Sequence, residues 1–278
     1  MDELSDYELE KSDEESIRPE SAQPRRTRLA WIVAGALVAA GVPAYFWYPR
    51  TPEAPASTVP TVAYRPLPQA ANAGAPIDVP PLDESDELVR RLVSALSSHP
   101  RIAAWLATDD LIRNFTVTVE NIASGVTPAR HLRVLRPAGP FRVVENEGEV
   151  LHIDPRSYQR YNGVADAVAS IDAAGAATLY STLEPRIEEA YRELGHDDGF
   201  DAALQRAIAA LVSTPVADGN VPVVYKGALN AFGNPRLEEL TAAQKQLLRM
   251  GPRNARLIQE KLREIAAALG IPVSGQAG

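Results

Sequence analysis

The feature that most constrains this chain is an uncharged run near its N-terminus, between Arg28 and Arg50. Residues 29–48 are twenty mostly apolar residues, and a helix needs about 20 such residues to cross a hydrocarbon layer of about 30 Å. Aromatic side chains lie near both ends of the run, as in the aromatic belts of membrane helices. We therefore predict one transmembrane helix over residues 29–48, with interface residues Trp31, Tyr45, Trp47 and Tyr48.

A cleaved signal peptide and a buried core helix are the alternatives to a membrane span. A signal peptide starts with a short basic segment, whereas 28 mostly polar residues precede this run. Pro43 and the aromatic residues that follow it also disfavour a cleavage site near residues 42–44. An uncleaved single span is the better interpretation.

The flanking cations set the expected orientation. Arg25, Arg26 and Arg28 directly precede the run, while Arg50 and Arg65 are the only cations in the thirty residues after it. Positively charged flanks stay in the cytoplasm. We therefore expect a bacterial inner-membrane protein with a cytoplasmic N-terminus and a periplasmic C-terminal domain.

The rest of the chain divides by composition. Residues 1–28 hold nine acidic and five basic side chains and few bulky apolar ones, so they are expected to be a disordered acidic tail. Residues 49–82 carry prolines throughout and are expected to be an extended spacer. Residues 83–270 are numerous enough to form a core, and residues 271–278 are expected to be a flexible tail.

The fold expected for residues 83–270 is mainly α (α+β with a small β-hairpin). Apolar residues recur at helical spacing in stretches that begin near Asp83 or Ser85, after Thr108, and over 158–171, 179–194, 200–211 and 258–269. Residues 141–145 and 149–153 alternate around Asn146-Glu147-Gly148 and predict the hairpin.

Smaller signals refine this pattern. Pro185 predicts a kink or break in its helix, and residues 221–225 predict an extended crossing or an edge strand because they include Pro222. His99, Asn234 and Thr241 stand where helix caps are expected, the last with Gln244 in a capping-box spacing.

Composition excludes several functions. The chain has no cysteine and four histidines, so disulfide frameworks, thiolate metal sites and cysteine nucleophiles are excluded. A net charge of −8 does not suit a nucleic-acid-binding protein. Phosphate-loop, dinucleotide, zinc-protease and nucleophile-elbow motifs are absent, and we predict no cofactor.

The only compact group that resembles a metal site is His196 with Asp197 and Asp198. Its spacing matches no calcium loop, and Asp198 is placed to cap the helix that begins near Phe200. Adjacent carboxylates such as Glu188 and Glu189 do not face each other on a helix, so they are not acid–base pairs by spacing. We predict no metal site and no catalytic residue.

Several blocks together resemble a bacterial membrane-anchored family catalogued as domain of unknown function 3014. The resemblance rests on Asp83–Asp86, Ala104–Arg113, Tyr158–Tyr161, Ala190–Gly195 and Gln244–Pro252. It covers nearly all of residues 80–270 and fits the anchor and the linker. It implies an architecture and a place in the cell envelope, and it supplies no activity or site residue.

One segment is a candidate binding surface. In a helix starting near Asp154, Arg156 and Arg160 are four residues apart and share a face, while Tyr158 and Tyr161 share another. Arginine with tyrosine is typical of interface anchors and of anion sites. The alternative is that the tyrosines edge the core and the arginines pair with acidic residues.

A second positive region surrounds Gly251-Pro252. It consists of Lys245, Arg249, Arg253 and Arg256. These cations are placed either to bind lipid headgroups or another anion, or to stabilise a helix C-terminus.

Two functions remain open at this point. The first is a non-enzymatic adaptor whose domain binds an envelope protein or a cell-wall component. The second is an envelope hydrolase, or a glycan- or anion-binding protein, with an unrecognised site. A pocket with converging polar groups favours the second, and an exposed apolar patch with a polar rim favours the first.

Overall fold

The computed structural model describes residues 77–146, 150–226 and 229–273. The chain divides into two compact units, residues 1–55 and 56–278, and every described residue belongs to the second. The predicted span, its interface residues Trp31, Tyr45, Trp47 and Tyr48, and the predicted tails lie wholly or mostly outside the described residues. Of the helices that are described, none has the length and apolarity needed to cross a membrane.

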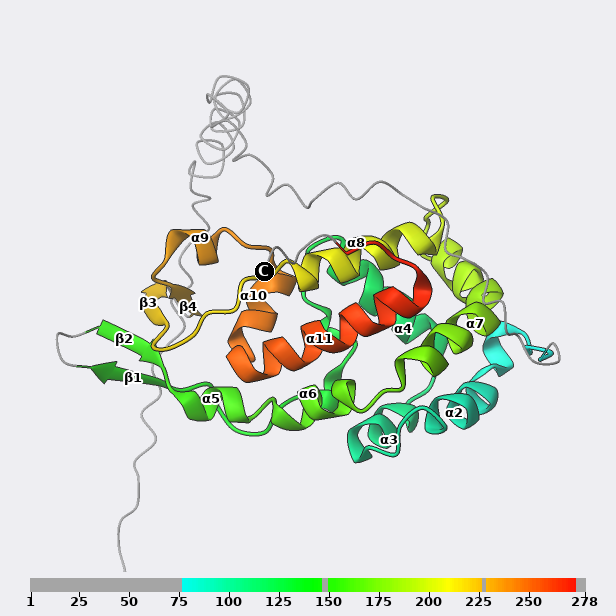
Figure 1. The fold of residues 1–278 in the computed structure, drawn as a ribbon, viewed down its shortest axis with the longest axis horizontal. Helices are drawn as coiled ribbons and strands as arrows, with labels where there is room; N and C mark the ends of the chain where they lie inside the picture. Colours follow the sequence, from blue (N-terminus) through cyan, green and yellow to red (C-terminus); the bar gives the residue numbers. More distant parts are fainter. Residues whose placement is uncertain (1–76, 147–149, 227–228, 274–278) are drawn as a thin grey trace, which may run out of the picture. The chain divides into compact units, whose positions relative to one another are not determined.

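The described part is mainly helical with one small antiparallel sheet, as predicted (Figure 1). The α-helices are α2 Asp86–Ser94, α3 Pro100–Leu106, α4 Leu111–Ala123, α5 Pro155–Gln159, α6 Asn162–Ala169, α7 Ala173–Glu193, α8 Phe200–Val212, α9 Pro235–Glu238, α10 Ala242–Arg249 and α11 Pro252–Leu269. Three short 3₁₀ turns are η1 Leu82–Glu84, η2 Pro128–Arg130 and η3 Arg133–Leu135. The strands are β1 Val143–Asn146, β2 Val150–Ile153, β3 Pro222–Lys226 and β4 Leu229–Phe232.

The largest core lies among α4, α7, α8 and α11. Leu111, Tyr191 and Phe200 are fully buried there, and the rings of Tyr191 and Phe200 meet edge to face with centroids 5.5 Å apart. Apolar burial and aromatic packing of this kind supply most of the stabilisation of a helical domain. Two smaller clusters continue it, one under the sheet and one between α6, α10 and α11.

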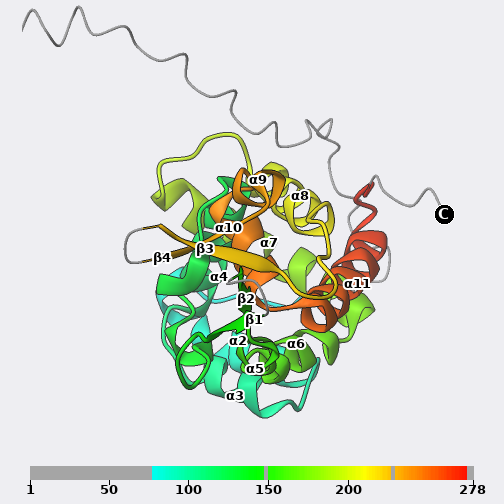
Figure 2. The same ribbon diagram turned by 90° about the vertical axis from the view of Figure 1, so that its left-hand side faces the viewer.

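The sheet has the strand order β1-β2-β3-β4, and every neighbouring pair is antiparallel (Figure 2). The predicted hairpin is confirmed as β1 and β2, with Val143 opposite Ile153. The prediction of an edge strand or simple crossing at residues 221–225 is wrong, because β3 lies between β2 and β4. Pro222 is tolerated because it is the first residue of β3. At the start of a strand, the missing N–H does not remove a hydrogen bond from the middle of the sheet.

Three predicted helix caps are confirmed. His99 Nδ1 accepts from the N–H of Arg101 at 3.1 Å, and the Asn234 side chain accepts from the N–H of Arg236. Thr241 and Gln244 form a complete capping box at the start of α10. α10 therefore has a well-determined beginning.

Two predicted caps are wrong. α4 starts at Leu111 rather than after Thr108, because Asp86 of α2 accepts the N–H groups of Asp110 and Leu111 at 2.9 Å each. α8 starts after Gly199, and Glu188 of α7 accepts the N–H of Phe200 at 2.8 Å. In both cases a carboxylate distant in the sequence replaces the local cap.

The helical stretch predicted over residues 158–171 is divided. α5 ends at Gln159, α6 begins at Asn162, and Arg160 and Tyr161 form the joint between them. α7, in contrast, continues through Pro185 as one helix. Of the two alternatives predicted at Pro185, a kink or a break, the break is wrong. A break that was not predicted lies at the candidate binding surface.

Candidate functional site

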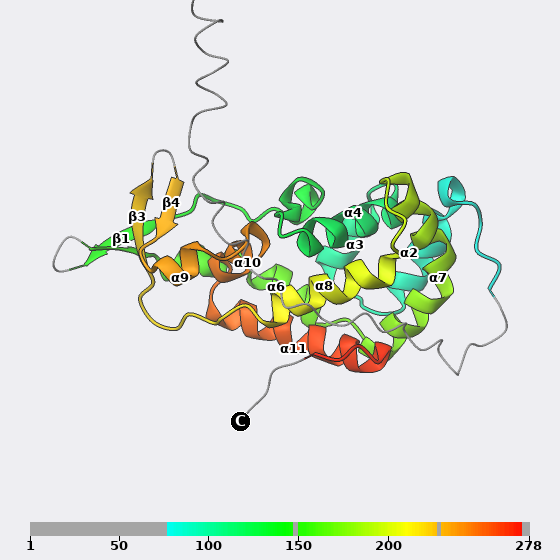
Figure 3. The ribbon, with the colours of Figure 1, turned by 90° about the horizontal axis from the view of Figure 1, so that it is seen from above.

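A groove of about 910 Å³ lies between the segment that links α4 to β1 and the helices α6 and α10. Figure 3 shows that linking segment running from the end of α4 towards the sheet. Residues that lie far apart in the sequence, from Ile122 to Ile258, line the groove. A volume of this size falls within the usual range of small-molecule sites, roughly 300–1,000 Å³.

One side of the groove is a face of α10. Ala243, Gln246, Leu247 and Met250 all line it, and their spacing of three and four residues places them on one face of the helix. Leu247 and Met250 are buried against the cluster that contains Ile258. The capping box fixes where α10 begins, and these four residues form one continuous wall of the groove.

The remaining walls are largely apolar. They are formed by Ile122 of α4, Val164 of α6, Leu211 of α8, and Pro128, Leu132, Leu135 and Pro137 of the linking segment. Apolar walls with a few placed polar groups are typical of ligand sites.

Arg160 lies in the joint between α5 and α6 and lines the groove. Its Nε donates to the carbonyl of Ser157 at 3.0 Å, and its Nη1 donates to the carbonyl of Gly139 at 2.8 Å. Its guanidinium also lies 5.9 Å from the centre of the Phe141 ring and 5.5 Å from that of Tyr161. Carbonyls and rings hold this cation in place without neutralising it.

Arg249, the last residue of α10, lines the same groove. Its Nη2 donates to the carbonyl of Asn230 at 3.3 Å, and its guanidinium lies 5.1 Å from the centre of the Phe232 ring. The charge of Arg249 also affects the pKa of Glu238. Burial alone would raise that pKa, but hydrogen bonds from Phe232 N–H and Lys245 Nζ, together with the charges of Lys245 and Arg249, hold it below its usual value.

Arg136 is the third cation at the groove, and Tyr161, Asn230 and Gln246 add polar groups. Gln246 Nε2 donates to the hydroxyl of Tyr161 at 3.2 Å. The Oδ1 of Asn230 is buried and has no hydrogen-bond partner within the described part of the chain. The described lining holds three arginines and neither a carboxylate nor a histidine, so its formal charge is positive in a chain of net charge −8.

The structure separates the four residues of the predicted binding surface. Arg160 and Tyr161 line the groove, whereas Arg156 and Tyr158 do not. Arg156 is exposed and forms an ion pair with Asp154 at 2.8 Å. The hydrogen bonds that Asp154 accepts from Arg156 lower the pKa of the Asp154 carboxyl.

Tyr158 has a packing role. Its ring lies against the backbone of Gly251 between α10 and α11, and its carbonyl accepts from Asn254 Nδ2 at 3.0 Å. Burial raises the pKa of its hydroxyl. Arg156 and Arg160 differ in their surroundings, since Arg156 lies within α5 and Arg160 follows its last residue and lines the groove.

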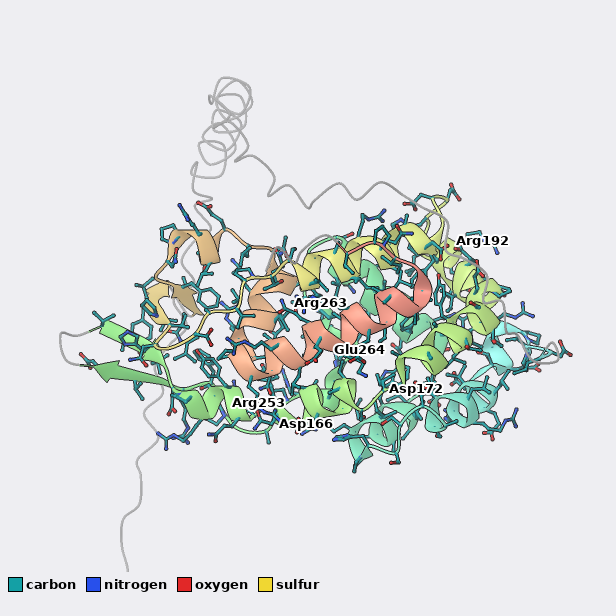
Figure 4. The ribbon with its side chains drawn as sticks, viewed as in Figure 1. Asp166, Asp172, Arg192, Arg253, Arg263 and Glu264 are labelled. Carbon is teal, nitrogen blue, oxygen red and sulfur yellow. The ribbon has the colours of Figure 1, made fainter. Side chains whose placement is uncertain are left out.

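The second positive region is also divided. Lys245 pairs with Glu238 at 3.1 Å, Arg256 pairs with Asp218, and Arg253 of α11 pairs with Asp166 of α6 at 2.8 Å (Figure 4). Among these four cations, Arg249 differs, since within the described residues no carboxylate lies at ion-pair distance from it. Its hydrogen bond goes to a carbonyl at the edge of the groove instead.

In the group that most resembled a metal site in the sequence, His196 and Asp198 have structural partners. His196 stacks on the Tyr191 ring with centroids 4.5 Å apart and lies 3.9 Å from Glu120. Asp198 accepts from the Tyr191 hydroxyl at 3.2 Å and pairs with Arg206 at 3.6 Å. Within the described ranges, no group of three or more histidine, aspartate and glutamate side chains is arranged to hold a metal ion.

Sequence reasoning missed much of the groove. Residues 127–139 carry no periodic pattern, and Arg136, Asn230 and Gln246 have no motif around them. Gly139 of this segment meets Arg160 only in the fold, where its carbonyl accepts from Arg160 Nη1 at 2.8 Å. Of the groove cations, sequence analysis singled out Arg160 and Arg249, each within a larger set.

Comparisons with known proteins place the chain in a family without assigning it an activity. No curated protein and no solved structure matches it. The model of the family described as "Protein of unknown function (DUF3014)" matches residues 111–266, which is more than half of the 278-residue chain and includes every lining residue of the groove. The block Asp83–Asp86 lies outside that match. The chain belongs to the family of proteins of unknown function DUF3014.

Proposed function

We propose that this protein is a membrane-anchored envelope protein whose C-terminal domain is a binding module for an anionic ligand. The observation that carries the proposal is the groove with Arg136, Arg160 and Arg249 in its lining and no carboxylate among the described residues there. Arginine recognises carboxylates and phosphates through several parallel N–H donors. The predicted span at residues 29–48 and its arginine flank support the placement in the inner membrane, with the domain in the periplasm.

Binding is a better proposal than hydrolysis. A hydrolase needs an acid–base pair, a metal or an activated nucleophile at the site. The titratable side chains of the described lining are three arginines and Tyr161. The half-buried Glu184 and the buried Asp201 both interact with Tyr180, among the core helices and outside the groove lining.

The ligand of such a module is expected to be an anionic molecule, or an anionic part of a larger component, of the cell envelope. A photo-crosslinking amino acid at Leu135, inside the groove, is expected to capture an anionic partner in living cells. The matched control is the neighbouring Val134, which is exposed and does not line the groove. Identification of the adduct by mass spectrometry gives the ligand class.

Charge variants test whether the capture depends on the groove cation Arg249. Arg249→Gln is expected to abolish the Leu135 adduct, whereas Arg256→Gln, which removes one charge on the neighbouring helix, is expected to keep it. Equal adducts from Leu135 and Val134, or an adduct that persists in Arg249→Gln, would refute the proposal. A periplasmic reporter joined after residue 278 tests the orientation, and an inactive reporter would contradict it.

A further inference from the structure

We propose that the groove binds a single-chain acyl carboxylate, with the carboxylate at Arg160 and Arg249 and the hydrocarbon chain along α10. This inference rests on the proposed anion-binding function and names the ligand class. Five features of the described residues support it. They are the position of the arginines, the N–H donors that these arginines keep, the direction of the apolar wall, its length, and the backbone carbonyls at the groove.

The two best-held arginines are at the sheet end of the groove. Arg160 lies over Phe141 and Arg249 over Phe232, and both rings belong to the apolar cluster under the sheet. Arg160 reaches this cluster from the α5–α6 joint, and Arg249 reaches it from the end of α10. Each planar guanidinium offers parallel N–H donors that match the two oxygens of a carboxylate.

Neither guanidinium is saturated. Arg160 uses Nε and Nη1 on carbonyls, and Arg249 uses Nη2 on the carbonyl of Asn230. Each keeps further N–H donors, because a guanidinium carries five. The side-chain amide of Asn230, whose buried Oδ1 has no partner, can turn to present its two N–H donors at the same place.

The opposite end of the groove is mainly apolar, with Thr127 beside Pro128 as a polar lining residue. α10 runs from Ala243, whose N–H donates to the carbonyl of Gly125 beyond the end of α4, to Arg249 beside β4. Ile122 and Pro128 line the groove near the first end, and Leu211 and Leu247 line it along the core side. An amphiphile with one charged end fits this polarity, whereas a compact polyanion leaves the apolar walls unused.

The length of α10 sets the length of the ligand. From Ala243 to Arg249 the helix rises about 9 Å, at 1.5 Å per residue. An extended hydrocarbon chain advances roughly 1.25 Å per carbon, because each bond of about 1.5 Å is tilted to the chain axis. A chain of about eight carbons therefore spans the wall.

An acyl chain suits these walls better than an extended peptide does. A peptide brings N–H and C=O groups that must be hydrogen-bonded when buried. The carbonyls of Gly139 and Asn230 at the groove already accept from Arg160 and Arg249. A hydrocarbon chain makes no such demand, and every methylene that it buries is favourable.

The test is calorimetric titration of the full-length protein, held in an amphipathic polymer free of detergent, with butanoate, hexanoate, octanoate and decanoate. The Kd is expected to fall about fourfold per added methylene and to level off near eight carbons. Octanol, which lacks the charge, is expected to bind at least about tenfold more weakly than octanoate.

Two pairs of variants locate the ligand. Arg249→Gln is expected to weaken octanoate binding at least about tenfold, while Arg256→Gln leaves it unchanged and Arg249→Lys weakens it less. Ala129→Trp, at an exposed lining position, is expected to block the chain, while Ala138→Trp, in the same segment but outside the lining, does not. Unfolding midpoints in urea identify any variant that acts through folding.

The outcomes separate this inference from the proposed function. Anion binding that needs Arg249 but is independent of chain length refutes the acyl ligand and leaves the anion-binding module standing. Octyl phosphate binding at least about tenfold more tightly than octanoate refutes the choice of a carboxylate. Octanol binding as tightly as octanoate refutes both, and so does the absence of binding by every anion.

Discussion

Replacing Gly251 with alanine tests the packing that holds α10, and with it one wall of the groove, in place. Gly251 separates α10 from α11 and has φ +87° and ψ 163°, a backbone region occupied almost only by glycine. A Cβ built on it would lie 2.4 Å from Cγ and 2.6 Å from Cβ of Tyr158. The close approach involves the root of the Tyr158 side chain, which no change of rotamer removes.

The expected cost has two parts. Holding a non-glycine residue in such a conformation costs of order 1–3 kcal/mol, and forcing a methyl group into a filled space costs typically 1–3 kcal/mol more. The lower entropy of the unfolded alanine chain returns about 0.4–1 kcal/mol. We therefore expect Gly251→Ala to lower the free energy of unfolding by about 3 kcal/mol.

Gly195→Ala is the matched control. Gly195 also has a positive φ of +89°, but a Cβ there would meet nothing within 4 Å, so only the conformational cost of roughly 1–2 kcal/mol applies. Urea unfolding of both variants, followed by circular dichroism, measures the difference. Equal midpoints for the two variants would refute the packing of Tyr158 against the α10–α11 turn.

Two further perturbations test features that support the core and the groove. Burial and the neighbouring charge of Asp201 raise the pKa of Glu184. Ionising Glu184 therefore costs stability as the pH rises from its unfolded-state pKa to its folded-state pKa, so Glu184→Gln is expected to stabilise the protein at pH 7 and to have little effect at pH 3. Urea midpoints at the two pH values check this, and a larger gain at pH 3 would contradict it. Thr241→Val removes the acceptor of the α10 capping box while keeping the shape of the side chain, and it is expected to lower the free energy of unfolding by about 1 kcal/mol. Thr178→Val, at an exposed position, is its control. Equal effects of the two variants on the urea midpoint would show that the cap contributes nothing.

Local rules predicted the features that depend on neighbouring residues. Helical spacing of apolar residues predicted the main helices, and the alternation on either side of residues 146–148 predicted the β1–β2 hairpin. The caps at His99, Asn234 and Thr241 were predictable for the same reason, since each side chain binds a backbone N–H only two or three residues away.

Features set by distant contacts were not predictable in this way. Asp86 supplies the cap of α4 from α2, and Glu188 supplies that of α8 from α7. The sequence contains a nearer candidate in each case, Thr108 and Asp198, so local reasoning chose the wrong residue. The pairing of β2 with β3 has the same origin, because it joins strands about 70 residues apart in the chain.

Which cation of the second positive region lacks an ion pair, among the described residues, was also not predictable from neighbouring residues. In the sequence, this region contains Lys245, Arg249, Arg253 and Arg256, with nothing to distinguish the three arginines. Folding brings Asp166 to Arg253 and Asp218 to Arg256, and exposed pairs of this kind contribute little to stability. Arg249 instead meets the Phe232 ring and a strand carbonyl. A cation that the fold holds in place without an ion pair is available to a ligand. Which cation this is depends on acidic residues far away in the chain.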